Sequence, residues 1–256
     1  SYEIKECDWS SDVCSSDLVA IPLDTPNMLA EVEGSIGWMT FNKPARRNAV
    51  SLDMWEAMPR ILERFEADPA VRTIVLRGAG DAAFVSGADI SQFEKARANP
   101  EMNAEYDAAL DRATEALEAC NKPTIAMIRG WCLGGGLAIA LNCDIRICSE
   151  ESQFGIPAAK LSIGYNAESL AQLIDLVGPS MAKEFLFTAR RYPAYEAHRL
   201  GLVNHVCAAH LLDSFVQAYA EQIAGNAPLS IIAAKRVIDE YVKDPEKRNK
   251  IGRAHV

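Results

Sequence analysis

The chain has 256 residues, of which 49% are hydrophobic and 24% are charged. These fractions are typical of a globular protein and exclude disordered, collagen-like and disulfide-scaffold classes. The net charge of -9 disfavours nucleic acid as a partner, and no apolar run reaches the roughly 20 residues that a membrane span needs, so we expect a cytoplasmic protein without nucleic-acid or membrane partners.

The two ends differ from the rest of the chain. Residues 1–18 show neither helical nor strand periodicity, and codons for Asp12 to Asp17 read on the opposite DNA strand encode Ile251 to Val256. We therefore expect residues 1–18 and 251–256 to derive from a translated sequencing adapter, the alternative being two ordinary disordered tails. Between them we expect one core domain over 19–190 and a helical region over 191–250.

Hydrophobic periodicity predicts strands and helices that alternate along the chain. Two alternating runs that meet at Gly34 predict an antiparallel hairpin over 28–41, and apolar runs predict buried strands over 73–78 and 123–130. A glycine- and alanine-rich loop is predicted over 78–90. Helices are predicted over 52–69, 100–120, 137–143, 170–178, 180–189, 195–201, 211–225 and 228–242, with short strands at 144–149 and near 202–206. This order predicts an α/β domain with a helical C-terminal part.

Three consecutive glycines, Gly134 to Gly136, stand between a predicted strand and a predicted helix. Bare backbone lets a ligand approach closely, and the start of a helix offers unpaired N–H groups at the positive end of its dipole. Such a place suits an oxyanion, although a tight packing turn explains the glycines equally well. In the segment AFVSGADI, the N–H of Ser86 is placed to face the glycines, and two facing N–H groups form an oxyanion hole.

Five segments carry a resemblance to the crotonase family, also called the enoyl-CoA hydratase/isomerase family. They are NKPARRNAVS, AFVSGADI, RGWCLGGGLAIALNCDIRI, SQFGIPAAKLSIG and FTARRYPAYEAHRLGLVNHV, within a similarity that covers about Met28 to Val242. The resemblance implies a ββα spiral core with a helical C-terminal extension that is truncated here. It also implies a homotrimer or dimer of trimers in which 191–250 is an incomplete trimerisation region.

The same resemblance implies an acyl-CoA thioester as substrate and no separate cofactor, because coenzyme A is part of the substrate. It assigns catalytic N–H groups to Ser86 and Gly135. It places the following residues at the coenzyme A and acyl pocket: Arg46, Ala49, Ala88, Asp89, Ile90 and Gly134. Arg46, Arg47, Lys235 and Arg236 are either contacts to coenzyme A phosphates or solvated surface charges. We expect no metal site, because no cysteine or histidine falls at metal-ligand spacing.

The sequence departs from the family at two positions that carry glutamate in its hydratases, here Ala138 and Ala158. Hydration and isomerisation need a base, which a methyl group cannot supply, whereas loss of CO₂ generates the thioester enolate without one. The segment KLSIGYNAES is similar to the methylmalonyl-CoA decarboxylase branch, which has a functional tyrosine at the position of Tyr165. That branch carries histidine at the position of Ala88 and usually glutamate at that of Ala138.

The residues therefore favour decarboxylase-like or other enolate chemistry, with Tyr165 as a third catalytic residue that orients the substrate. Asn166 and Glu168 are possible further site residues, although Glu168 is better explained as a first-turn residue of a helix over 168–177. Two alternatives remain: an enoyl-CoA hydratase with a non-standard site, and an inactive acyl-CoA-binding protein of the same fold.

Overall fold

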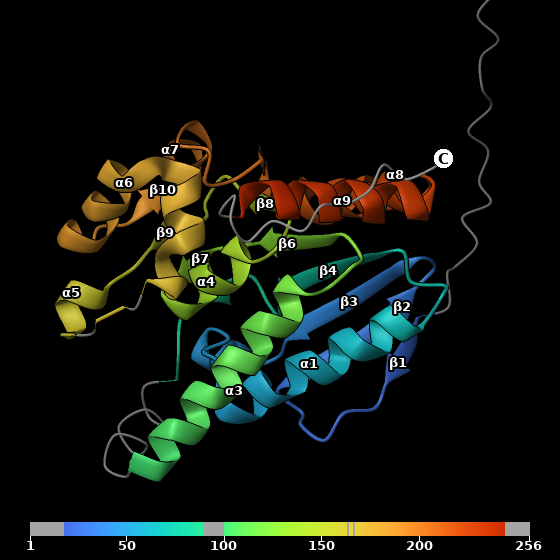
Figure 1. Ribbon diagram of the computed structural model, residues 1–256, viewed down its shortest axis with the longest axis horizontal. Helices are drawn as coiled ribbons and strands as arrows, with labels where there is room; N and C mark the ends of the chain where they lie inside the picture. Colours follow the sequence, from blue (N-terminus) through green and yellow to red (C-terminus); the bar gives the residue numbers. More distant parts are fainter. Residues whose placement is uncertain (1–17, 90–99, 163, 166, 244–256) are drawn as a thin grey trace, which may run out of the picture.

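A computed structural model describes residues 18–89, 100–162, 164–165 and 167–243 of the chain (Figure 1). Of the adapter-derived segments expected at 1–18 and 251–256, all residues except Leu18 lie outside the described ranges, as do the site candidates Ile90 and Asn166. Two sheets organise the described part, one of seven strands and one of four.

The large sheet has the strand order β1-β2-β3-β4-β6-β8-β11. The hairpin expected around Gly34 is confirmed, because β2 and β3 pair antiparallel and Gly34 adopts the positive φ of 57° that a tight turn requires. From β3 onward all neighbours are parallel. The strands are β1 (Val19–Ile21), β2 (Met28–Glu33), β3 (Ile36–Phe41), β4 (Thr73–Gly78), β6 (Thr124–Ile128), β8 (Ile145–Ser149) and β11 (His205–Cys207).

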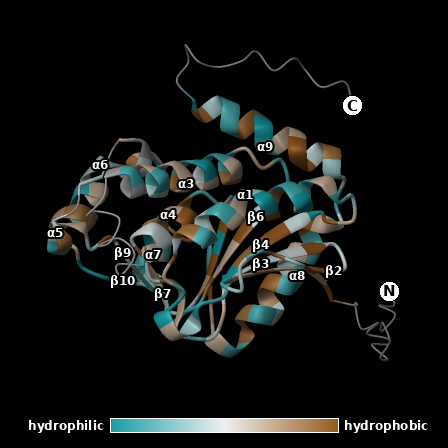
Figure 2. Ribbon diagram, turned by 90° about the horizontal axis from the view of Figure 1, so that it is seen from below, coloured by the Kyte–Doolittle hydropathy of each residue, from teal (hydrophilic) through white to brown (hydrophobic). Residues whose placement is uncertain are grey.

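The central strands are buried on both faces, which explains their continuous apolar sequences (Figure 2). One face packs against α1 (Leu52–Ala67) and α3 (Pro100–Glu118), and the other packs against α8 (Leu212–Ala224). Trp38 and Val75 point to the α8 side, whereas Met39 and Leu76 point to the α1 side. Parallel strands between helix layers confirm the expected α/β class.

The small sheet, in the order β10-β9-β7-β5, was not predicted. Its strands are β5 (Ala83–Val85), β7 (Trp131–Leu133), β9 (Gln153–Gly155) and β10 (Tyr192–Pro193). The segment 78–90, expected to be loop throughout, contains β5, and no sequence pattern pointed to β9. Such short strands are set by pairing: a Cβ on Gly130 would lie 2.3 Å from the Ala82 oxygen, so only glycine permits this approach of two backbones.

The remaining helices are η1 (Pro44–Arg46), α4 (Gly135–Leu141), α5 (Ala158–Leu161), η2 (Glu168–Leu170), α6 (Ala171–Thr188), α7 (Ala194–Arg199), η3 (Ala209–Leu211) and α9 (Pro228–Val242). Among them, α4, α6, α7 and α9 follow the predicted order with small shifts at their ends, whereas the short helices η1, α5 and η3 were not predicted. The break expected between the helices at 170–178 and 180–189 is present inside α6, where Gly178 has φ 77° before Pro179. The strand expected near 202–206 begins later, at His205.

Candidate active site

The glycine stretch lies where two parallel strands of the small sheet end. β5 ends at Val85 and β7 ends at Leu133, so the loops that follow them emerge at the same edge of the sheet. Gly134 caps α4 with φ 52° and donates its own N–H to the Gly155 oxygen at 2.9 Å. A Cβ on Gly136 would lie 2.2 Å from the Val85 oxygen, so glycine at this position lets α4 pack directly on β5. The glycines therefore serve both packing and the exposure of backbone donors.

The N–H group that faces Gly135 belongs to Ala88. A Cβ built on Gly135 would lie 3.8 Å from the Ala88 nitrogen. Within the described residues neither N–H has a hydrogen-bond partner. Val50 donates to the Gly87 carbonyl and accepts from the Asp89 N–H, so it pairs with the residues on either side of Ala88. Gly135 is in the first turn of α4, where helical N–H groups have no intrahelical acceptor. We call the two groups, Ala88 N–H and Gly135 N–H, the donor pair.

The sequence analysis had assigned Ser86 to this position, and the structure corrects it. The Ser86 N–H donates to the Arg47 carbonyl at 3.1 Å and is therefore occupied. Arg47 adopts a left-handed backbone conformation, with φ 52°, that turns this carbonyl towards the loop. Successive N–H groups of an extended chain point in opposite directions, so residues two apart share a side only where the chain stays regular. The turn at Gly87, with φ 117°, breaks that regularity and leaves Ala88 facing α4.

The Ala88 loop is fixed by an ion pair and by a buried amide. Lys43 Nζ lies 2.7 Å from Asp89 Oδ2, and the two side chains are only 22% and 10% exposed. The Asn48 side chain is fully buried and donates to the carbonyls of Ala79 and Ala83, at 3.0 and 2.8 Å. Asp89, expected to line the coenzyme A pocket, thus holds the loop that carries Ala88. The sequence analysis did not identify Lys43, because nothing in its spacing linked it to a residue 46 positions later.

Tyr165 is brought to the site, as the sequence analysis expected. Its hydroxyl oxygen lies 3.8 Å from the position of a Cβ on Gly134. Burial raises the pKa of the Tyr165 hydroxyl above its usual value of 10, so the group is neutral and able to donate near pH 7. It makes no hydrogen bond within the part of the chain that the structure describes.

Ala138 lies one turn into α4 and Ala158 begins α5. Ala158 is 6% exposed, and Ala138 is half-buried. Neither position can supply a proton-transferring side chain. Among the described residues, this edge of the small sheet thus brings together two backbone donors and one neutral phenol, beside the loop that the Lys43–Asp89 ion pair holds.

Comparison with known proteins identifies the family. A family model described as Enoyl-CoA hydratase/isomerase matches residues 31–255. The short-chain-enoyl-CoA hydratase of Clostridium acetobutylicum is 36% identical over 217 residues, which are 85% of this chain and 82% of the relative. The chain belongs to the enoyl-CoA hydratase/isomerase family.

Two further similarities show the breadth and the fold of the family. The peroxisomal Delta(3,5)-Delta(2,4)-dienoyl-CoA isomerase of Arabidopsis thaliana is 34% identical over 218 residues, covering 80% of this chain and 78% of the relative. The crystal structure of an enoyl-CoA hydratase/carnithine racemase from Magnetospirillum magneticum has a TM-score of 0.82 at 38% identity, covering 86% of this chain and 82% of that one. The expected crotonase-type fold is thereby confirmed.

Other expected site residues of this enoyl-CoA hydratase/isomerase family member lie in the surrounding loops. Arg46 is exposed on η1, and Ala49 is half-buried just before the bridge to Ala88. Glu168 begins η2, in place of the expected first turn of a longer helix. Lys235 was considered a phosphate contact, but its Nζ lies 2.8 Å from Asp144 Oδ2, so it ties α9 to the core.

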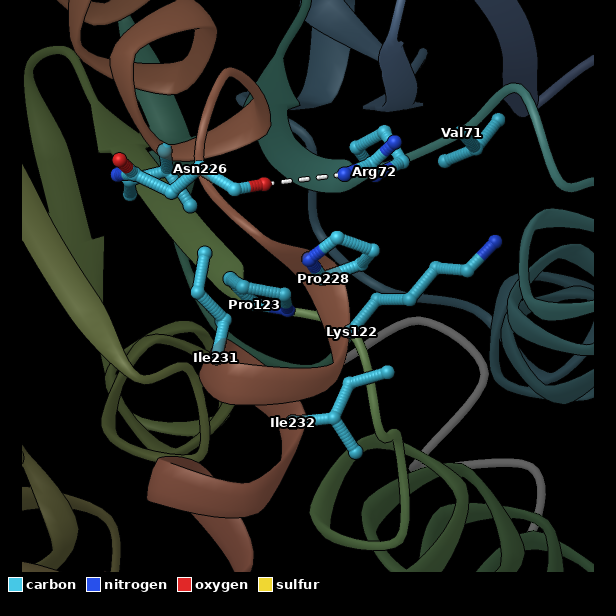
Figure 3. A pocket seen from close by; sticks show the side chains of 9 residues that line it. Val71, Arg72, Lys122, Pro123, Asn226, Pro228, Ile231 and Ile232 are labelled. Carbon is cyan, nitrogen blue, oxygen red and sulfur yellow. Dashed lines mark hydrogen bonds between the residues drawn. The ribbon is translucent and has the colours of Figure 1, made fainter. Parts of the chain in front are cut away.

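A small cavity of about 40 Å³ lies at the other end of the large sheet, near the amino ends of β4 and β6 (Figure 3). Its two cations are already engaged: Arg72 donates to the Asn226 carbonyl at 3.0 Å, and Lys122 donates to the carbonyls of Phe65 and Asp68. The wall is otherwise mostly apolar, with Ile231 and Ile232 from α9. This cavity lies between α9 and the amino ends of β4 and β6, and it is separate from the donor pair.

The described residues contain no group of three or more His, Cys, Asp or Glu side chains arranged to hold a metal ion. Within the same residues, no helix has both the length and the apolar character to cross a membrane. The cysteines of the described part are all unpaired: Cys120, Cys132, Cys143, Cys148 and Cys207. Burial raises the pKa of the Cys143 and Cys148 thiols to about 12, so these side chains are inert apolar contacts.

Proposed function

We propose that this protein acts on an acyl-CoA thioester by stabilising its enolate between the backbone N–H groups of Ala88 and Gly135. The proposal is carried by one observation: two N–H groups that have no hydrogen-bond partner among the described residues converge on one space at the edge of the small sheet. A thioester oxygen that accepts both hydrogen bonds gains stabilisation as negative charge develops on it. Each such donor is typically worth about 3–4 kcal/mol in the transition state.

The preferred reaction is decarboxylation. The bond between the α-carbon and a substrate carboxylate breaks, its electron pair forms the enolate, and CO₂ leaves. Water or the Tyr165 hydroxyl then protonates the α-carbon. This sequence needs no carboxylate base, which agrees with alanine at 138 and 158. The neutral Tyr165 hydroxyl beside Gly134 is suited to donate a hydrogen bond that orients the departing carboxylate.

The first alternative is hydration, because several relatives are named as hydratases. Addition of water to a conjugated thioester needs a group that deprotonates the water and one that manages the proton at the α-carbon. Tyr165 is the titratable side chain that lies beside Gly134, and the Asp89 carboxylate next to Ala88 is held in an ion pair with Lys43. A second alternative, an inactive protein that binds acyl-CoA, is favoured by the same two alanines.

The test is incubation of the purified protein with methylmalonyl-CoA and, separately, with crotonyl-CoA, with products identified by mass spectrometry. Loss of CO₂ from methylmalonyl-CoA supports the proposal, and the same reaction in D₂O places one deuterium on the α-carbon. Gain of one water by crotonyl-CoA alone overturns the decarboxylase preference in favour of hydration. Binding of both thioesters without turnover favours the inactive protein.

We further propose a homotrimer or dimer of trimers in which α9 packs on a second copy of the chain, acting in the cytosol. Support comes from the exposed apolar side chains of α9, among them Leu229, Ile238 and Tyr241 at 79%, 62% and 72% exposure. The unpaired cysteines agree with a reducing compartment. Light scattering after size-exclusion chromatography tests the assembly, and a monomeric mass at micromolar concentration contradicts it.

A further inference from the structure

A large aromatic side chain from a distant part of the sequence adjoins the donor pair. Trp55 lies on α1, 80 positions before Gly135, yet its Cζ2 atom is 3.8 Å from the position of a Cβ on Gly135. The Ala88 nitrogen is at the same distance from that position. The edge of the indole ring and the donor pair therefore border one space. Trp55 is only 2% exposed, so its ring forms a closed side of that space.

The position of the Trp55 indole ring is fixed by a hydrogen bond to a buried tyrosine. Trp55 Nε1 donates a hydrogen bond to the Tyr106 hydroxyl at 2.9 Å, within the packed interface of α1 and α3. Tyr106 is 4% exposed, and burial raises the pKa of its hydroxyl, which stays protonated near neutral pH. A buried donor that lost this acceptor would be left without a partner, so the ring is held in one orientation.

The described residues that carry and flank the two donors are small. Gly134 precedes Gly135 at the start of α4 and Ala88 carries the other donor, so these residues present bare backbone and one methyl group. Tyr165 approaches on the side of Gly134, whereas Trp55 approaches on the side of Gly135. A thioester whose oxygen lies between the donors therefore meets the indole edge within a few carbon atoms of its carbonyl.

We propose that Trp55 is a specificity-determining residue, the wall that limits the acyl group to a short chain, and that Tyr106 is its positioning residue. This inference rests on the proposed function, because it assumes that the thioester oxygen occupies the donor pair. An acyl chain that is too long must displace a buried ring whose hydrogen bond and packing hold it. Such overpacking typically reduces affinity about tenfold or more.

The experiment measures binding of saturated thioesters that offer no carboxylate to lose: acetyl-, butyryl-, hexanoyl- and octanoyl-CoA, by isothermal titration calorimetry. We expect the wild type to bind butyryl-CoA at least about tenfold more tightly than octanoyl-CoA. Trp55→Leu should remove most of that preference by improving octanoyl-CoA binding, and Trp55→Phe, the milder change, should reduce it. Tyr106→Phe should reduce it less, because the ring stays but loses its hydrogen bond.

Trp38→Phe is the matched control, because Trp38 is an equally buried tryptophan that faces α8 on the other side of the large sheet. It should leave the preference unchanged. A wild type that binds octanoyl-CoA as tightly as butyryl-CoA overturns the inference, as does a folded Trp55→Phe variant with the wild-type preference. Failure of the wild type to bind any of the four thioesters would instead refute the proposed function.

Discussion

Alanine substitutions at two adjacent glycines, Gly135 and Gly136, should affect different properties of the protein, the first its turnover and the second its stability. Gly135 and Gly136 both lie in the first turn of α4, and neither has a positive φ. A Cβ on Gly135 would have its nearest neighbours at 3.8 Å, the ordinary van der Waals distance. A Cβ on Gly136 would lie 2.2 Å from the Val85 oxygen and 2.7 Å from the Val85 Cβ, where no atom fits.

Gly135→Ala should therefore fold normally and lose activity. Alanine is favoured over glycine inside a helix by about 0.5–1 kcal/mol, so the free energy of unfolding should stay equal or rise by up to that amount. The new methyl group stands in the space on which the donor pair converges, where an oxyanion needs donors at about 2.7–3.1 Å. Turnover should fall about 10²- to 10³-fold, the usual effect of losing one oxyanion donor.

Gly136→Ala should instead lower the stability, because the added methyl group would force α4 away from β5. We expect it to lower the free energy of unfolding by about 3 kcal/mol, the upper part of the range for overpacking. Urea titration followed by tryptophan fluorescence measures stability, and mass spectrometry of the thioester products measures turnover. A Gly135→Ala protein with wild-type turnover would refute the donor pair as the oxyanion site. A Gly136→Ala protein of wild-type stability would refute the packing of α4 on β5.

Four further outcomes are expected. Tyr165→Phe should lower turnover about 10- to 100-fold through loss of a hydrogen bond to a charged group, without loss of stability. Because burial raises the Tyr165 pKa above 10, the hydroxyl stays protonated below that pH, and wild-type turnover should not decline through this group before pH 10; a Tyr165-dependent decline below pH 9 contradicts this. Arg146→Met should lower the free energy of unfolding, measured by urea titration, by about 3 kcal/mol or more. The reason is the loss of a buried guanidinium that donates to the carbonyls of Ala140, Cys143 and Leu202. A change below about 1 kcal/mol contradicts this prediction. Iodoacetamide at pH 8 should leave Cys148, whose pKa is raised to about 12, unlabelled in the native protein but not in urea, as read by peptide mass spectrometry; rapid native labelling contradicts its burial.

Most of the large sheet and its helices were predictable because these elements carry their own signals, the exception being β1, which was not predicted. The hairpin at Gly34, the apolar runs of β4 and β6, and the amphipathic pattern of α1 are local properties of the sequence. The small sheet was not predictable in the same way. Its strands have two or three residues each, and their pairing depends on contacts such as that between Gly130 and Ala82, which become visible only in the folded chain.

At the proposed site, the sequence analysis expected Gly135 and Tyr165, which the structure brings close together, but it assigned the second donor to Ser86. Both Ser86 and Ala88 lie in the segment after β5, and spacing alone does not tell which N–H is free. In the structure the Ser86 N–H is not free, because it donates a hydrogen bond to the Arg47 carbonyl. Trp55 gave no signal either, since a tryptophan on the apolar face of a helix is normally a core residue. Only the approach of α1 to the start of α4 makes it a neighbour of the donor pair.

The central claim is that the thioester oxygen accepts hydrogen bonds from Ala88 and Gly135, and infrared spectroscopy tests it most directly. Butyryl-CoA labelled with ¹³C at the thioester carbonyl gives a C=O stretch that an isotope difference spectrum separates from the protein bands. Two donors polarise the carbonyl, so the band of the bound thioester should shift to lower wavenumber than in water, and Gly135→Ala should abolish the shift. A bound thioester whose carbonyl band lies at its value in water, or whose shift survives Gly135→Ala, would contradict the account.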